Sequence, residues 1–190
     1  MSSQEQSDDP AAPSPTVILG VYTVIGSILS FSVGHTPGRL PDSVLAEVCP
    51  SIAVICFFLC TYSVYDVMAC GVVKAKHRIF LKERSSPKDL PEEVFLAERA
   101  QMNQVEQLPV FLVSTMCFSV LVHGKVGALL ALVWCILRRL YASRYRNSVG
   151  IPIDKKGLSN YTIPCYFLVN AMLMGSVVHA LRWTMVTDAQ

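Results

Sequence analysis

Runs of about twenty mostly apolar residues constrain the fold of this chain more than any other feature of its sequence. A transmembrane helix needs ~20 such residues to cross the hydrocarbon core of a bilayer. The runs cover residues 51–73, 94–122, 126–145 and 161–183. Only 16% of the 190 residues are charged, against about 25% in soluble domains. The sequence therefore predicts an all-α fold, a transmembrane four-helix bundle.

A fifth apolar run, residues 17–34, follows a polar, Pro- and Ser-rich tail. A signal peptide needs a positive region before its apolar core, whereas this tail carries Glu5, Asp8 and Asp9. We therefore expect an extra N-terminal transmembrane helix, which either crosses the membrane or lies on it. The predicted organisation is a disordered tail (1–16), this helix and its turn (17–46), and a four-helix membrane domain (47–185).

Basic residues gather in the loops 74–88 and 144–157, whereas the loop HGK at 123–125 holds only one lysine. Lys and Arg accumulate on the cytoplasmic side of membranes, so both basic loops are predicted to be cytosolic. The net charge of +2 is too small to indicate a nucleic-acid partner. The seven cysteines and four histidines show no spacing typical of a metal site, so none is predicted.

Polar residues recur on one face of the second predicted bundle helix, at Arg99, Asn103 and Glu106. The next helix carries a matching stripe at the same depth, formed by Arg138, Tyr141 and Tyr145. A charge at bilayer depth costs about 2.5–3.5 kcal/mol on insertion scales, so such groups usually face a bundle interior or a wet cavity. Either the charges neutralise each other and the tyrosines form an interfacial belt, or the two stripes bind a small polar ligand.

A further carboxylate, Asp66, lies inside the first apolar run. It is either the partner of a buried cation in the bundle, or a group at a wet subunit interface, or a carboxyl that is held neutral. The sequence leaves these alternatives open.

The segment RAQMNQVEQLP resembles the signature of the MAPEG family, the membrane-associated proteins of eicosanoid and glutathione metabolism. The matching residues are Arg99, Ala100, Asn103, Glu106 and Pro109. The position of the proline is similar to that in the branch of microsomal glutathione transferases and leukotriene synthase. RRLYASRY resembles the tyrosine segment of the family's third helix. The resemblance covers residues 51–183.

The resemblance implies that glutathione is a co-substrate bound between the subunits of a homotrimer, while a lipophilic substrate arrives from the bilayer. Arg99 would bind a carboxylate, Asn103 the peptide backbone and Glu106 the ammonium group. Tyr141 and Tyr145 would bond to the ligand from the facing helix. The implied glutathione-binding set also includes Arg138, Lys76 and His77.

The family's thiolate-stabilising arginine has no counterpart at its expected spacing after Tyr145. A nearby cation lowers the pKa of a thiol, so the catalytic candidates here are the cations of that loop, Lys156, Lys155 and Arg146. Gln107 also replaces the tyrosine that the leukotriene synthase has after its glutamate.

The predicted function is a membrane glutathione transferase or peroxidase acting on lipophilic electrophiles or lipid hydroperoxides. Members of the family usually reside in the endoplasmic reticulum, so the resemblance implies that location for this chain. The main alternative is a non-catalytic scaffold that presents lipids, similar to the lipoxygenase-activating branch. An unrelated tetraspanin or channel subunit fits less well, because the loop HGK is short and no pore-lining repeat is present.

Overall fold

The computed structural model describes residues 14–33, 42–79, 90–153 and 155–187, and every regular element in these ranges is a helix. Residues 1–36 and 37–190 form two separate units. The first unit contains α1 (Pro15–Val33). The second contains, in chain order, α2 (Asp42–Tyr62), η1 (Ser63–Met68), α3 (Ala69–Lys76), α4 (Glu92–Phe118), η3 (Ser119–His123), α5 (Gly124–Arg146) and α6 (Lys155–Thr187).

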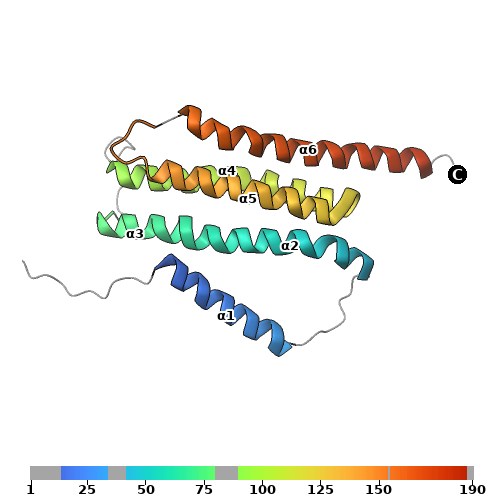
Figure 1. The fold of residues 1–190 in the computed structure, drawn as a ribbon, viewed down its shortest axis with the longest axis horizontal. Helices are drawn as coiled ribbons and strands as arrows, with labels where there is room; N and C mark the ends of the chain where they lie inside the picture. The colour runs from blue at the N-terminus through green and yellow to red at the C-terminus, as the bar shows by residue number, and fades with distance from the viewer. Residues whose placement is uncertain (1–13, 34–41, 80–89, 154, 188–190) are drawn as a thin grey trace, which may run out of the picture. The chain divides into compact units, whose positions relative to one another are not determined.

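Three helical stretches are long and apolar enough to cross a membrane, namely Asp42–Lys76, Glu92–Arg146 and Gly157–Met185. The second has 55 residues, and a straight helix of that length would be about 80 Å long, far more than the ~30 Å hydrocarbon core. The chain instead reverses at His123, whose backbone is extended (φ −168°, ψ 117°). The predicted four-helix bundle is therefore confirmed, with α2–α3, α4, α5 and α6 side by side (Figure 1).

The boundaries at the N-terminal side differ slightly from the expected ones. The helix α1 begins at Pro15, two residues inside the segment expected to be a disordered tail. The helix α2 begins at Asp42, within the segment expected to be a turn, and an acidic residue in a first turn suits the positive end of the helix dipole. Residues 1–13 and 34–41 lie outside the described part. Whether α1 crosses the membrane stays a prediction.

The reversal between α4 and α5 depends on a close approach at Gly124. Its backbone N–H donates to Glu47 Oε2 at 2.7 Å. A Cβ at this position would collide with the main chain of Glu47. Ser51 adds a hydrogen bond of 2.6 Å between its hydroxyl and that of Ser119. Because glycine has no Cβ, the tight turn can pack directly against α2.

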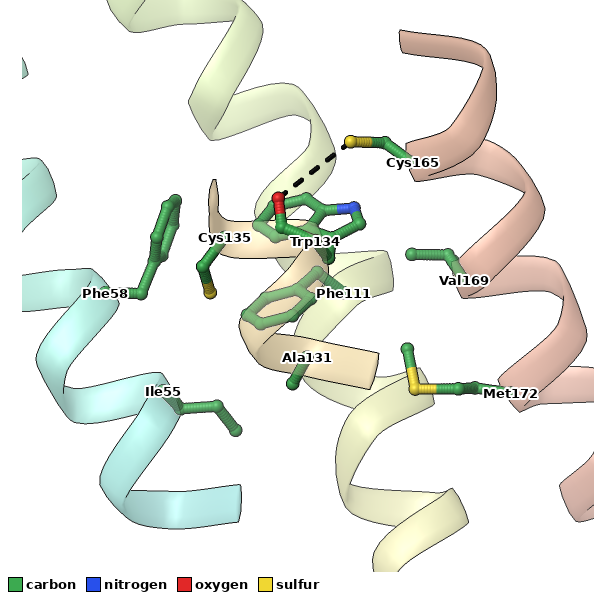
Figure 2. Close-up of a cluster of buried hydrophobic side chains, with 9 residues drawn as sticks. All are labelled: Ile55, Phe58, Phe111, Ala131, Trp134, Cys135, Cys165, Val169 and Met172. Carbon is green, nitrogen blue, oxygen red and sulfur yellow. Dashed lines mark hydrogen bonds between the residues drawn. The ribbon is translucent and has the colours of Figure 1, made fainter. Parts of the chain in front are cut away.

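The middle of the bundle is a cluster of apolar side chains contributed by α2, α4, α5 and α6 (Figure 2). The rings of Phe111 and Trp134 are stacked with centroids 3.9 Å apart, and Phe58 meets Trp134 edge-on at 5.3 Å. On the α6 side, the Cys165 thiol points toward the Trp134 carbonyl oxygen at 4.0 Å. This core fixes the four helices against each other just beyond the polar stripes.

Both predicted basic loops begin and end at the same end of the bundle. His77, after α3, lies 3.0 Å from Glu93 Oε2 of α4. The backbone N–H of Gly150, which follows α5, donates to Glu92 Oε2 at 3.1 Å. The loop residues Lys82, Arg84 and Lys88 lie outside the described part of the chain. One end of the membrane domain is therefore basic, as the cytosolic assignment requires, while the orientation in a membrane stays a prediction.

Candidate functional site

The two polar stripes meet where α4 and α5 run antiparallel. Asn103 Nδ2 donates to the hydroxyl oxygen of Tyr141 at 2.9 Å. The ring of Tyr141 stacks on that of Tyr145, with centroids 5.9 Å apart. The equal depth predicted from the two helical periodicities is thus realised in a direct contact. Tyr141 lies at its centre, bonded on one side and stacked on the other.

The two charged residues of the α4 stripe have a different environment from Asn103. Arg99 and Glu106 are both exposed on the surface of the single chain, whereas Asn103 is half-buried. No described residue forms a salt bridge with Arg99 or Glu106. The alternative in which these two charges neutralise each other therefore has no support in the described contacts.

Beneath the stripes, α4 and α5 are joined by a reciprocal clamp between Gln104 and Arg138. Arg138 Nε donates to Gln104 Oε1 at 2.8 Å, and Gln104 Nε2 donates to the Arg138 carbonyl oxygen at 2.9 Å. Arg138 also donates to the carbonyl oxygen of Asn103. Its guanidinium lies over the Tyr141 ring at 4.9 Å and over the Trp134 ring at 5.8 Å. The clamp fixes the height at which Asn103 faces Tyr141.

The clamp places Arg138 in the bundle interior. Its residue surface is only 2% exposed, so the guanidinium faces the bundle interior and not the open face that carries Arg99. Its described hydrogen bonds go to protein groups, and its predicted contact with glutathione stays a prediction. Gln104 was missed by the sequence reasoning, although a polar residue next to Asn103 inside an apolar run was a signal that could have found it.

Asp66 is buried and is the partner of two partly exposed arginines, which favours the first of the three alternatives left open by the sequence. Its carboxylate accepts hydrogen bonds from Arg139 and from Arg146, the latter at 2.8 Å, and the residue is 1% exposed. Arg146 also donates to the carbonyl oxygen of Tyr65. Asp66 and Tyr65 belong to the π-helix η1, a type of bulge that is frequent at functional sites.

The ion pair of Asp66 involves Arg146, one of the three predicted catalytic cations. The guanidinium of Arg146 is engaged by the Asp66 carboxylate and turns toward η1, whereas Tyr145 faces Tyr141. Lys155 begins α6, and the side chains of Lys155 and Lys156 lie outside the described part of the structure. Arg146 therefore already has a carboxylate partner, and the catalytic roles of Arg146, Lys155 and Lys156 all stay predictions.

The residues expected to close the site from the end of α3 are also placed. Lys76 Nζ lies 2.9 Å and His77 Nε2 3.0 Å from the same oxygen of Glu93, at the start of α4. Lys74 pairs with Glu98 at 2.6 Å. Within the single chain, Lys76 and His77 thus lie beside the acidic first turn of α4, one to two helical turns from Arg99.

One further polar contact extends the site to α6. Gln107 Nε2 donates to the hydroxyl oxygen of Tyr166 at 3.0 Å. The sequence reasoning did not single out Tyr166, because an isolated tyrosine in an apolar helix carries no periodic signal. Among the described residues, no three His, Cys, Asp or Glu side chains come together as a metal site requires.

The model of the MAPEG family matches residues 51–178, about two thirds of the chain and every element that carries the site. No individual curated protein matches the chain.

Proposed function

The chain belongs to the MAPEG family, and from that premise we propose that it is a glutathione transferase or peroxidase acting on lipophilic electrophiles or lipid hydroperoxides. Membership in the family makes it a multi-pass membrane protein of a group concerned with glutathione and eicosanoid metabolism. The proposal goes further and assigns this chain its own catalytic activity, with the endoplasmic reticulum as its location.

The observation that carries the proposal is the open polar face of α4 beside the bonded pair of Asn103 and Tyr141. Arg99 and Glu106 are an exposed cation and an exposed anion, separated by about two helical turns, inside a helix that reads as a membrane span. Glutathione is a zwitterion with two carboxylates and one ammonium group. It offers a complementary charge to each residue and so offsets the cost of holding both at membrane depth.

Each residue of the stripes has a role that suits its chemistry. Arg99 binds a carboxylate through its planar fork, and Glu106 accepts hydrogen bonds from the ammonium group. The amide oxygen of Asn103 can accept from the ligand's peptide N–H, while its amide nitrogen donates to Tyr141. Tyr141 and Tyr145 bond to the ligand from α5.

A homotrimer completes the proposed site. A charged face exposed on a membrane helix is unfavourable toward lipid, so a neighbouring subunit is the natural cover for Arg99 and Glu106. In such an assembly Lys76 and His77, at the end of α3, close the site from the adjacent subunit. Their present contacts with Glu93 are on the protein surface, where exchange for a ligand carboxylate costs little.

The proposed chemistry begins with ionisation of the glutathione thiol. A free thiol has a pKa near ~8.5, so an adjacent cation must stabilise the thiolate at neutral pH. Because Asp66 engages Arg146, we assign this role to Lys156, with Lys155 as its neighbour. The thiolate then attacks an electrophile that has entered from the bilayer.

The test is a glutathione titration of the detergent-purified full chain that follows both bound glutathione and thiolate absorbance near neutral pH. Binding with a thiolate signal is the expected result. Binding without that signal would contradict an activated thiol. Absence of binding at millimolar glutathione would overturn the proposal in favour of the lipid-presenting scaffold, which needs no glutathione site.

A further inference from the structure

Tyr166 of α6 holds a hydroxyl group at the edge of the polar stripes. Its oxygen accepts the hydrogen bond from Gln107 Nε2 at 3.0 Å. A phenol has one proton to donate, and this contact uses only the oxygen's acceptor capacity. The hydroxyl is thus held in place by α4 while its own proton remains available for an acceptor outside the chain.

The surroundings of Tyr166 indicate what kind of acceptor can reach it. Tyr166 is 48% exposed, and its sequence neighbours Ile163 and Phe167 on α6 are exposed apolar side chains. These residues lie within the apolar stretch of a spanning helix, so the surface around the hydroxyl suits lipid or a lipophilic molecule.

Tyr166 is also close to the proposed glutathione site. Its partner Gln107 directly follows Glu106 in α4. A single hydroxyl therefore stands between the polar stripes and the apolar face of the bundle, where a bilayer-borne substrate would meet a bound thiolate.

We propose that Tyr166 donates its proton to the oxygen atom of the lipophilic second substrate on which negative charge develops when the thiolate attacks. The substrate class is a lipid hydroperoxide or an α,β-unsaturated carbonyl compound. This inference rests on the function proposed above and deepens it, because it specifies which electrophiles the site prefers.

With a lipid hydroperoxide, the thiolate attacks the O–O bond. The thiolate sulfur forms a bond to the distal oxygen, the O–O bond breaks, and the electron pair leaves on the alkoxide oxygen. Tyr166 transfers its proton to that oxygen, so the products are an alcohol and a glutathione sulfenic acid. A second glutathione thiol reduces the sulfenic acid to the disulfide and water. The proton released when the first thiol ionised restores the phenol.

The carbonyl step uses the same proton. A C–S bond forms at the β-carbon, the π electrons move to the carbonyl oxygen, and the developing enolate oxygen receives the proton of Tyr166. Donors aimed at a developing oxyanion lower a barrier more than donors aimed at a neutral group. An alkyl halide such as benzyl chloride develops no oxyanion, because its leaving group is chloride.

The experiment compares Tyr166→Phe with the unmodified full chain in detergent, using an α,β-unsaturated ketone, a lipid hydroperoxide and benzyl chloride as electrophiles. We expect kcat/KM for the first two to fall by about 10²-fold, the lower end of general acid effects. The rate with benzyl chloride, the glutathione affinity and the thiolate absorbance should stay close to those of the unmodified chain.

Tyr161→Phe is the matched control. It removes the same atom from the same helix five positions earlier, where the hydroxyl accepts from Arg144 Nη1 at 3.2 Å. All three electrophiles should react with this variant as with the unmodified chain.

The outcomes separate this inference from the proposed function. An equal loss, or no loss, on all three electrophiles in Tyr166→Phe with an intact thiolate signal would overturn the role of Tyr166 and leave the enzyme standing. An unmodified chain that binds no glutathione would overturn the proposed function, and this inference with it.

Discussion

Asp66 and Arg146, 80 positions apart in the sequence, are joined by a hydrogen bond of 2.8 Å between Oδ1 and Nη1. Arg139, seven residues before Arg146, donates to the other oxygen of the same carboxylate. The spacing of seven puts both arginines on the same face of α5, the face that is turned toward η1. One carboxylate of η1 therefore holds two turns of α5 against the stretch formed by α2, η1 and α3. The opposite face of α5 presents Tyr141 to α4.

Asp66→Ala should be strongly destabilising, because it leaves two guanidinium groups without their anion inside the bundle. Breaking a buried pair in this way costs about 3 kcal/mol, the low end of the usual range because both arginines are partly exposed. The measurement is the free energy of unfolding in detergent. Asp42→Ala, at an exposed aspartate in the first turn of α2, serves as the control and should cost at most about 1 kcal/mol, because it loses only an interaction with the helix dipole. Equal effects of the two variants would contradict the structural role of Asp66.

The clamp between Gln104 and Arg138 should appear as energetic coupling. In a double-mutant cycle of Gln104→Leu and Arg138→Met, we expect a coupling free energy of about 1–3 kcal/mol, because the two side chains are buried and bond reciprocally. The same cycle with Arg139→Met in place of Arg138→Met should give less than about 0.5 kcal/mol. Arg139 is the neighbouring residue, but its guanidinium faces Asp66. Similar coupling in the two cycles would show that the clamp is not specific.

Much of the bundle could be predicted because membrane helices obey a simple length rule. The apolar runs gave the four helices of the bundle, and the spacing of Asn103 and Tyr141 gave facing stripes at one depth. The rotation of each helix could not be predicted. Membrane helices are apolar on nearly all sides, so a 3.6-residue period cannot tell whether Arg138 faces a ligand or Gln104.

Two other features were beyond sequence reasoning for different reasons. A π-bulge such as η1 shifts the register of every residue after it, and no residue type marks it in the chain. Tyr166 meets Gln107 only because α6 packs beside α4, a contact across 59 positions with no local pattern. Tertiary packing determined both.

Gly124→Ala should destabilise the turn between η3 and α5. The added Cβ meets the main chain of Glu47, which cannot move without shifting α2, so we expect a loss of about 1–3 kcal/mol in the free energy of unfolding. Gly71→Ala is the matched control, since a Cβ there has no atom within 4 Å. That variant should be neutral or more stable by up to about 1 kcal/mol, because alanine favours a helix. A stable Gly124→Ala would mean that the turn is looser than the structure indicates.

Arg99→Ala should weaken glutathione binding without unfolding the protein. The side chain is exposed and forms no salt bridge with a described residue, so its removal should cost less than about 0.5 kcal/mol of stability. Losing a charged hydrogen bond of about 1.5–3 kcal/mol corresponds to a Kd for glutathione raised by about 10- to 100-fold. Arg182→Ala removes an exposed arginine from the far end of α6 and should leave the Kd unchanged. A variant that unfolds while the surviving protein binds normally would make Arg99 structural.

The identity of the thiolate-stabilising cation follows from what Arg146 already does. Because Asp66 holds its guanidinium, Arg146→Ala should lower the free energy of unfolding and leave the thiolate absorbance of bound glutathione in place. Lys156→Ala should do the reverse: glutathione still binds, but the thiol pKa returns toward ~8.5 and the absorbance at pH 7 falls to the few per cent expected of a free thiol. Lys156→Arg should retain the signal, because a guanidinium keeps the positive charge. If Arg146→Ala abolishes the absorbance and Lys156→Ala does not, the cation that activates the thiol is the one bonded to Asp66, and that carboxylate becomes part of the proposed catalytic site.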